Sequence, residues 1–89
     1  MMKQIWKFWI KDIDDQIEID MPEDAEILCV QVQYGEPYIW AIVDDDMGPE
    51  TRTFRIYGTG HEMDANATDR YIGTFWVGQL VFHLFERIK

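Results

Sequence analysis

The sequence predicts an all-β domain of about seven short antiparallel strands, arranged as a small sandwich or an open barrel. Apolar and polar residues alternate along most of the chain, and turn-forming residues recur roughly every 8–12 residues. No stretch shows the period of an amphipathic helix. This pattern is typical of antiparallel sandwiches and barrels. With 89 residues, positions 1–89 are expected to form a single domain.

The first two strands are expected at residues 3–10 and 12–21. In the first, Trp6, Phe8 and Ile10 share one face. In the second, isoleucines alternate with carboxylates, and the phase breaks near the middle, where a turn or bulge fits. Because lysines mark the first strand and carboxylates the second, we expect the two strands to pair within the monomer.

Five further strands are separated by turns rich in Pro, Gly and Asp, and they are expected at 27–33, 38–43, 51–58, 70–76 and 80–85. In the strand at 27–33, Leu28, Val30 and Val32 are expected to point into the core. The last two strands form a hairpin that turns at Gly78. Residues 62–70 are polar and rich in turn formers, and a short helix is an alternative for this segment.

The chain is strongly acidic, with a net charge of −9. The segment from Asp12 to Thr51 contains 13 carboxylates and none of the eight Lys and Arg residues. Such a field repels phosphate backbones and acidic membranes, so we expect no direct binding to nucleic acid or to a membrane. A basic protein or nucleoprotein complex is the complementary partner. A lone cysteine and the lack of a long apolar run favour a cytoplasmic location.

Catalysis, metal binding and a cofactor are not expected. The chain has no serine, and Cys29 lies in an apolar strand, where a thiol is hidden from substrates. A catalytic zinc site needs three well-placed protein ligands. His61, Glu62 and Asp64 are close in sequence, but His83 lies among apolar residues and is expected to be a half-buried strand residue.

A first candidate site is an acidic row beside an aromatic patch, and it would bind a protein partner. Same-face residues of an extended strand are about 6.6 Å apart, so carboxylates at alternate positions form a ladder of negative charge. The candidates are Asp12, Asp14, Glu18 and Asp20, the cluster of Asp44, Asp45 and Asp46, and the aromatic residues Trp9, Tyr38 and Trp40. The alternatives are a solvated strand face that protects a sheet edge, and aromatic residues that are covered within the domain.

A second candidate site is an anion-binding turn that follows a strand. Two nearby glycines allow positive φ angles, so successive N–H groups can line a concavity that holds an anion. The candidate ligand-binding residues are Arg52, Arg55, Tyr57, Gly58, Thr59, Gly60, His61 and Arg70. The spacing differs from that of a phosphate loop, since no lysine follows. The alternative is a glycine-shaped turn that ends the strand.

Short segments spread over almost the whole chain carry a family resemblance. They include Ile5-Trp6-Lys7, Met21-Pro22, Val30-Gln31-Val32-Gln33, Gly58-Thr59-Gly60-His61 and Val81-Phe82-His83-Leu84-Phe85. With these segments the chain resembles a family of small proteins from bacteriophage and prophage genomes. Glu23-Asp24 stands where relatives are expected to have glycine, which makes this member more acidic. The resemblance implies an accessory protein in the bacterial cytoplasm and supplies no catalytic or ligand residues.

The leading functional expectation is a non-enzymatic binding protein that blocks the basic, nucleic-acid-binding surface of a host defence protein, as anti-CRISPR and anti-restriction proteins do. The alternatives are a sponge for an anionic nucleotide signal and a minor virion or structural protein. A homodimer with Trp9, Tyr38 or Trp40 in the contact is also expected, because exposed aromatic residues favour self-association.

Overall fold

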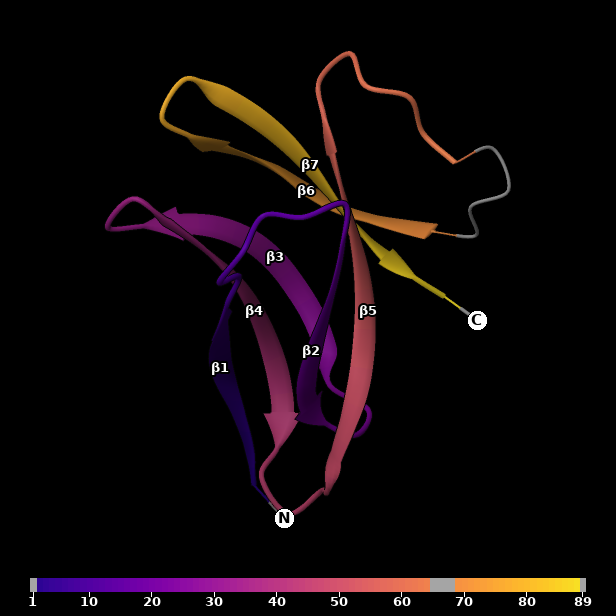
Figure 1. Cartoon of the computed structure of the whole chain (residues 1–89). Helices are drawn as coiled ribbons and strands as arrows, with labels where there is room; N and C mark the ends of the chain where they lie inside the picture. Colours follow the sequence, from indigo (N-terminus) through magenta and orange to yellow (C-terminus); the bar gives the residue numbers. More distant parts are fainter. Residues whose placement is uncertain (1, 65–68, 89) are drawn as a thin grey trace.

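Seven strands form two antiparallel sheets in the computed structural model, which describes residues 2–64 and 69–88 (Figure 1). One sheet has the strand order β1-β4-β3, and the other has the order β2-β5-β7-β6. The strands are β1 (Lys3–Trp9), β2 (Gln16–Pro22), β3 (Glu26–Gln33), β4 (Glu36–Asp44), β5 (Pro49–Gly58), β6 (Asp69–Val77) and β7 (Leu80–Arg87). The prediction of an all-β fold is confirmed, and the architecture is a sandwich.

No helix occurs in the described residues, so none of them belongs to a helix long and apolar enough to cross a membrane. The short helix considered for residues 62–70 is absent from residues 62–64 and 69–70. Residues 65–68 lie outside the described part of the chain.

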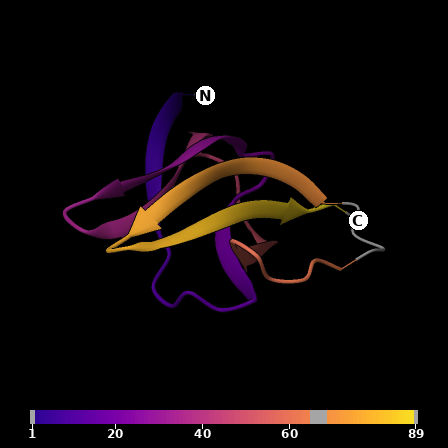
Figure 2. The ribbon, with the colours of Figure 1, turned by 90° about the horizontal axis from the view of Figure 1, so that it is seen from above.

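Tight turns connect the strands of the two hairpins β3–β4 and β6–β7. Tyr34 and Gly35 have φ angles of 53° and 78°, and Gln33 pairs with Glu36 on either side of them. Two successive positive φ angles are typical of the type I′ turn, whose twist matches that of the strands it connects. Gly78 has a φ angle of 60° in the β6–β7 turn, as predicted. Both turns project on the same side of the molecule (Figures 1 and 2).

The core lies between the sheets and is built from alternate residues of both. Ile10, Ile39, Phe54 and Leu84 are each at most 1% exposed. Fully burying such a side chain contributes about 1.5–3 kcal/mol. Trp6, Phe8 and Ile10 share the inner face as predicted, although Trp6 remains 38% exposed.

A bulge in β3 changes which of its residues face the core. The register against β4 shifts between Ile27 and Cys29, and the buried residues are Ile27 and Val30. The prediction that Leu28 points inward was wrong: the extra residue turns it outward, and it is 43% exposed. Val32 follows the face of Val30 but is 38% exposed, because it lies close to the hairpin turn.

The prediction that the first two strands pair with each other was wrong. β1 pairs with β4, and β2 pairs with β5 in the other sheet. The intervening chain crosses between the sheets: Ile10 is buried and donates its N–H to the carbonyl of Pro37, and the carbonyl of Asp15 accepts the N–H of Ile56. β1 and β2 are therefore both edge strands. β2 begins at Gln16, so Asp12 and Asp14 lie in the crossing.

The side chain of Arg52 connects elements on both sides of the core. The guanidinium of Arg52 on β5 donates to the carboxylate of Glu86 on β7, which is 4% exposed. It also donates to the carbonyl of Ala25, just before β3, over 2.9 Å. The hydrogen bond to Glu86 is the main reason that the pKa of Arg52 is raised.

Candidate functional site

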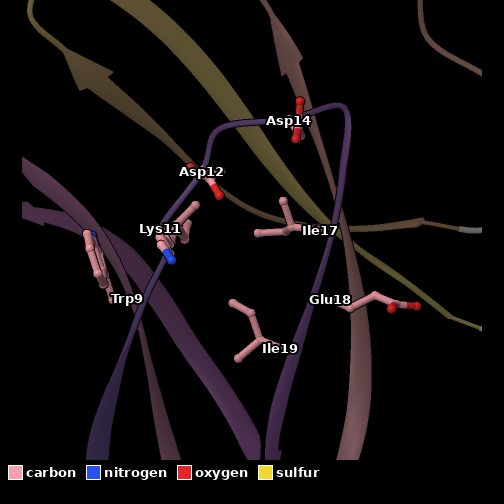
Figure 3. A pocket seen from close by; sticks show the side chains of 8 residues that line it. Trp9, Lys11, Asp12, Asp14, Ile17, Glu18 and Ile19 are labelled. Atoms are coloured by element: carbon pink, nitrogen blue, oxygen red, sulfur yellow. The ribbon is translucent and has the colours of Figure 1, made fainter.

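The crossing between β1 and β2 frames an open groove of about 300 Å³ (Figure 3). Its lining includes Trp9, Asp12, Asp14, Ile17, Glu18 and Ile19. Figure 3 shows Ile17 and Ile19 pointing into the space under the crossing, whereas Glu18 points to the other side of β2. Alternation along β2 produces this arrangement, because successive side chains of a strand point to opposite faces. The groove therefore has an isoleucine floor below a crossing that carries carboxylates.

Among the described residues, the carboxylates at this groove form no ion pair with a basic side chain. Within residues 2–64 and 69–88, the ion pairs of arginine involve Glu50, Asp64, Asp69 and Glu86. Asp12, Asp14 and Glu18 take part in none of them. Lys11 also lines the groove but forms no ion pair with a described residue. An apolar floor under an excess of carboxylates suits a side chain with an aliphatic stem and a cationic head.

The acidic row predicted along one strand is divided into two parts. Asp12 and Asp14 belong to the crossing, while Glu18 and Asp20 lie exposed on the outer face of β2. Asp20 accepts a hydrogen bond of 2.6 Å from the hydroxyl of Thr51 on β5. The crossing between the sheets causes the division, since it ends the extended conformation before β2 begins.

The three candidate aromatic residues share one face of the three-stranded sheet. Trp9 lies opposite Tyr38, and Lys7 lies opposite Trp40. The ammonium group of Lys7 is 4.6 Å from the ring centroid of Tyr38 and 5.8 Å from that of Trp40. Trp9 is 48% exposed, and it links this face to the groove because it lines both.

The second acidic cluster lies at the other end of β1. Asp44 pairs with Lys3, whereas Trp9 lies six residues further along the strand, roughly 20 Å away. The carboxylate of Asp44 accepts the N–H of Asp46, and the carboxylate of Asp45 accepts a hydrogen bond from Gln4. Their carboxylate oxygens lie within 4.8 Å of one another, but they contribute nothing to the groove.

The glycine-rich segment forms a turn whose N–H groups are already used. The N–H of Thr59 donates to the carbonyl of Val81, and that of His61 donates to the carbonyl of Gly58. Gly60 has a φ angle of 88°. Two of the donors that would line the predicted anion site are thus directed to carbonyl oxygens.

The candidate arginines do not converge on this turn. Arg52 is held by Glu86 in the interior. Arg55 lies over the ring of Tyr57, with 5.2 Å between its guanidinium carbon and the ring centroid, and 3.9 Å from Asp64. Arg70 is exposed on β6.

Four residues beside the turn were missed as ligand candidates, namely Met63, Tyr71, His83 and Phe85. Tyr71 and Phe85 line one pocket together with Tyr57, His61 and His83. The two-residue spacing of His83 and Phe85 indicates a shared strand face. The sequence alone does not show that β6 brings Tyr71 to the same face.

A comparison with known proteins gives the chain a family but no function. No curated protein and no solved structure matches it. A family model described as a domain of unknown function (DUF7352) matches residues 1–89. Nothing in this match bears on phage origin, which stays a prediction. Because the match spans all 89 residues, the chain belongs to the DUF7352 family.

Proposed function

We propose that this protein is a binding protein whose acidic groove receives a basic segment of a partner protein. The groove carries the proposal, because its carboxylates have no basic partner among the described residues and its floor is apolar. An arginine or lysine of the partner would lay its aliphatic stem on Ile17 and Ile19. Its cationic head would then face Asp12 and Asp14.

The free edge of β2 supports an extended conformation for that segment. Among the described strands, β2 pairs only with β5, so the backbone groups on its other edge can pair with an added strand. Side chains of the added strand would alternate between the isoleucine floor and the outer face, where Glu18 and Asp20 lie. A segment that alternates apolar and basic residues therefore fits best.

The partner that we propose is a host defence protein with a basic nucleic-acid-binding surface, in the bacterial cytoplasm. The net charge of −9 and the resemblance to small phage proteins support this choice. Carboxylates on a protein surface compete with phosphates for the same lysines and arginines. Binding would exclude the nucleic acid, and its rate would fall as salt screens the attraction.

Fluorescence anisotropy with a labelled peptide of alternating arginine and valine tests the groove. The double variant Asp12→Lys/Asp14→Lys is expected to weaken binding at least tenfold, a loss of about 1.4 kcal/mol or more. The matched control is Asp45→Lys/Asp46→Lys, which changes the net charge equally at the far end of β1. It is expected to weaken binding less than about threefold, through the general field alone.

Two results would count against the proposal. Equal losses in both double variants would show that only net charge attracts the peptide. Unchanged binding in the groove variant would exclude the groove as its site. The same pair of variants then separates specific from general capture when the protein is used to pull down partners from a bacterial lysate treated with nuclease.

A further inference from the structure

A second pocket, of about 280 Å³, lies on the outer face of the four-stranded sheet. The turn after β5 forms one wall, and side chains of β5, β6 and β7 form the rest. Both histidines of the chain, His61 and His83, line it. It shares no lining residue with the acidic groove. Its size is slightly below the roughly 300–1,000 Å³ of sites for drug-sized ligands, so a smaller molecule fits.

Aromatic rings make up much of the pocket lining. The ring centroids of Tyr57 and Phe85 are 5.7 Å apart at an interplanar angle of 78°, and those of Tyr71 and Phe85 are 5.3 Å apart at 60°. These edge-to-face contacts hold the three rings in fixed orientations. Such a preorganised wall favours a planar, aromatic ligand over a flexible one.

A chain of hydrogen bonds gives the pocket polar groups of adaptable direction. The two ring nitrogens of His83 bond to the hydroxyls of Thr59 and Thr74, over 2.8 and 2.9 Å. The hydroxyl of Thr74 lies 2.6 Å from that of Tyr71. Each hydroxyl can donate or accept, so the chain can present either a donor or an acceptor at Thr59 and Tyr71.

Two further polar groups at the pocket lack partners among the described residues. Tyr57 is 6% exposed, and its hydroxyl is buried without a hydrogen bond. Buried hydroxyls are normally paired, and no described residue pairs with this one. The ring of His61 is packed against Gly58, where an added Cβ would lie 2.8 Å from it. Its nitrogens make no hydrogen bond to a described residue.

The electrostatics of the pocket disfavour an anionic ligand. Arg55 lies near Asp64, and Arg87 lies 3.5 Å from Asp64 and 3.0 Å from Asp69, so the adjacent cations already face carboxylates. The N–H groups of Thr59 and His61 donate to carbonyls. With a net charge of −9, the protein also repels phosphates at long range.

We propose that this pocket binds a small, uncharged ligand of the purine nucleoside class through its planar heteroaromatic base. Its ring would contact the wall of Tyr57, Tyr71 and Phe85. Its ring nitrogens and exocyclic groups would bond to His61 and to the ends of the hydrogen-bond chain. This site is independent of the proposed function, since it uses other residues and an uncharged ligand.

Titration with adenosine and guanosine, followed by ¹H–¹⁵N NMR, tests the site. The amide signals of residues 57–63, 71–74 and 81–85 are expected to shift, while those of residues 10–20 at the groove stay in place. Adenosine 5′-monophosphate is expected to bind at least about fivefold more weakly than adenosine, because the field repels its phosphate. Tighter binding of the monophosphate would overturn the assignment of an uncharged ligand.

Two variants and one control locate the binding site. Gly58→Ala displaces the ring of His61, and His61→Ala removes that ring from an exposed position, so at least one of them keeps the fold. Each is expected to weaken nucleoside binding roughly tenfold, the size of one lost ring contact with its hydrogen bond. The control is Tyr34→Asn, which removes a ring that is 94% exposed and suits the positive φ of that turn. The proposal is overturned if neither nucleoside shifts these signals at millimolar concentration, if the shifts map elsewhere, or if His61→Ala binds like the wild type.

Discussion

Replacing Glu86 with leucine is expected to lower the free energy of unfolding by about 3 kcal/mol. Glu86 is 4% exposed on β7 and accepts two hydrogen bonds from the guanidinium of Arg52 on β5. The same guanidinium donates to the carbonyl of Ala25 beside β3. Leucine has a similar volume, so the change removes the carboxylate without opening a large cavity. It leaves the cation of Arg52 buried beside an apolar side chain.

The magnitude follows from how far Arg52 is buried. Removing one partner of a buried ion pair costs about 3–5 kcal/mol, because the other charge stays desolvated. The side chain of Arg52 is 16% exposed and keeps an ion pair with Glu50 over 3.7 Å, which places the cost at the lower end of that range. For a domain of this size, each kcal/mol lowers the melting temperature by about 4–8 °C, so a fall of roughly 12–24 °C is expected.

The loss of stability caused by Glu86→Leu should not depend on pH near neutrality. The pKa of Arg52 is raised, first by its hydrogen bond to Glu86. A cation with a raised folded pKa stabilises the protein fully below its unfolded pKa, and this contribution is lost only as the pH rises through the folded value. Both values lie in strongly alkaline solution. The cost measured at about pH 6 should therefore equal that at about pH 8.

Urea unfolding followed by tryptophan fluorescence measures the effect. The double variant Arg52→Met/Glu86→Leu is expected to recover at least half of the loss, since no desolvated cation remains beside the leucine. About 1 kcal/mol should stay lost, because the carbonyl of Ala25 loses a donor. A single variant within about 1 kcal/mol of the wild type, or a double variant no more stable than the single one, would refute the reasoning.

Three further predictions follow from particular contacts. Tyr57→Phe should raise the free energy of unfolding by about 1 kcal/mol in urea, because it removes a buried hydroxyl that has no hydrogen bond to a described residue; a loss of stability would reveal an unseen partner. Gly73→Ala should lower the melting temperature at a cost of about 1–3 kcal/mol, since an added Cβ would lie 2.9 Å from the Cγ1 of Val30; an unchanged temperature would mean that β3 and β6 separate easily. If the expected homodimer forms through the aromatic face, Trp9→Glu should leave a monomer in light scattering at high salt, and a persisting dimer would place the contact elsewhere.

The existence of all seven strands was predictable because alternation is a local property. Each strand carries its own period of two, and the turns at Tyr34-Gly35 and Gly78 carry their own positive φ requirement. Strand pairing is not local. The opposite charges of the first two strands suggested that they pair, yet the crossing at Ile10 sends β2 to the other sheet. Alternation continues through such a crossing, so the sequence also placed Asp12 and Asp14 in the strand.

The candidate sites were predictable to different degrees. Trp9 and Tyr38 share a face because β1 pairs with β4, which is a fact of register that no local pattern contains. Leu28 points outward because of a bulge in β3, and no local pattern in the sequence marks this bulge either. Tyr71 joins the pocket of Tyr57 only because β7 lies between β5 and β6. Composition therefore indicates which residues are available, and topology decides which of them meet.

Two of the four edge strands, β1 and β2, carry opposite charges. An edge strand with an apolar face invites pairing with another chain, and charged residues oppose it. β1 carries Lys3 and Lys7, while β2 carries Glu18 and Asp20, so like edges of two molecules repel each other. The edge of β1 remains compatible with that of β2 in a second copy. Association through these edges would weaken with salt, whereas association through the aromatic face of Trp9 and Tyr38 would strengthen, because salt screens the repulsion of two acidic molecules. The sign of the salt dependence thus distinguishes association through the edges of β1 and β2 from association through the aromatic face.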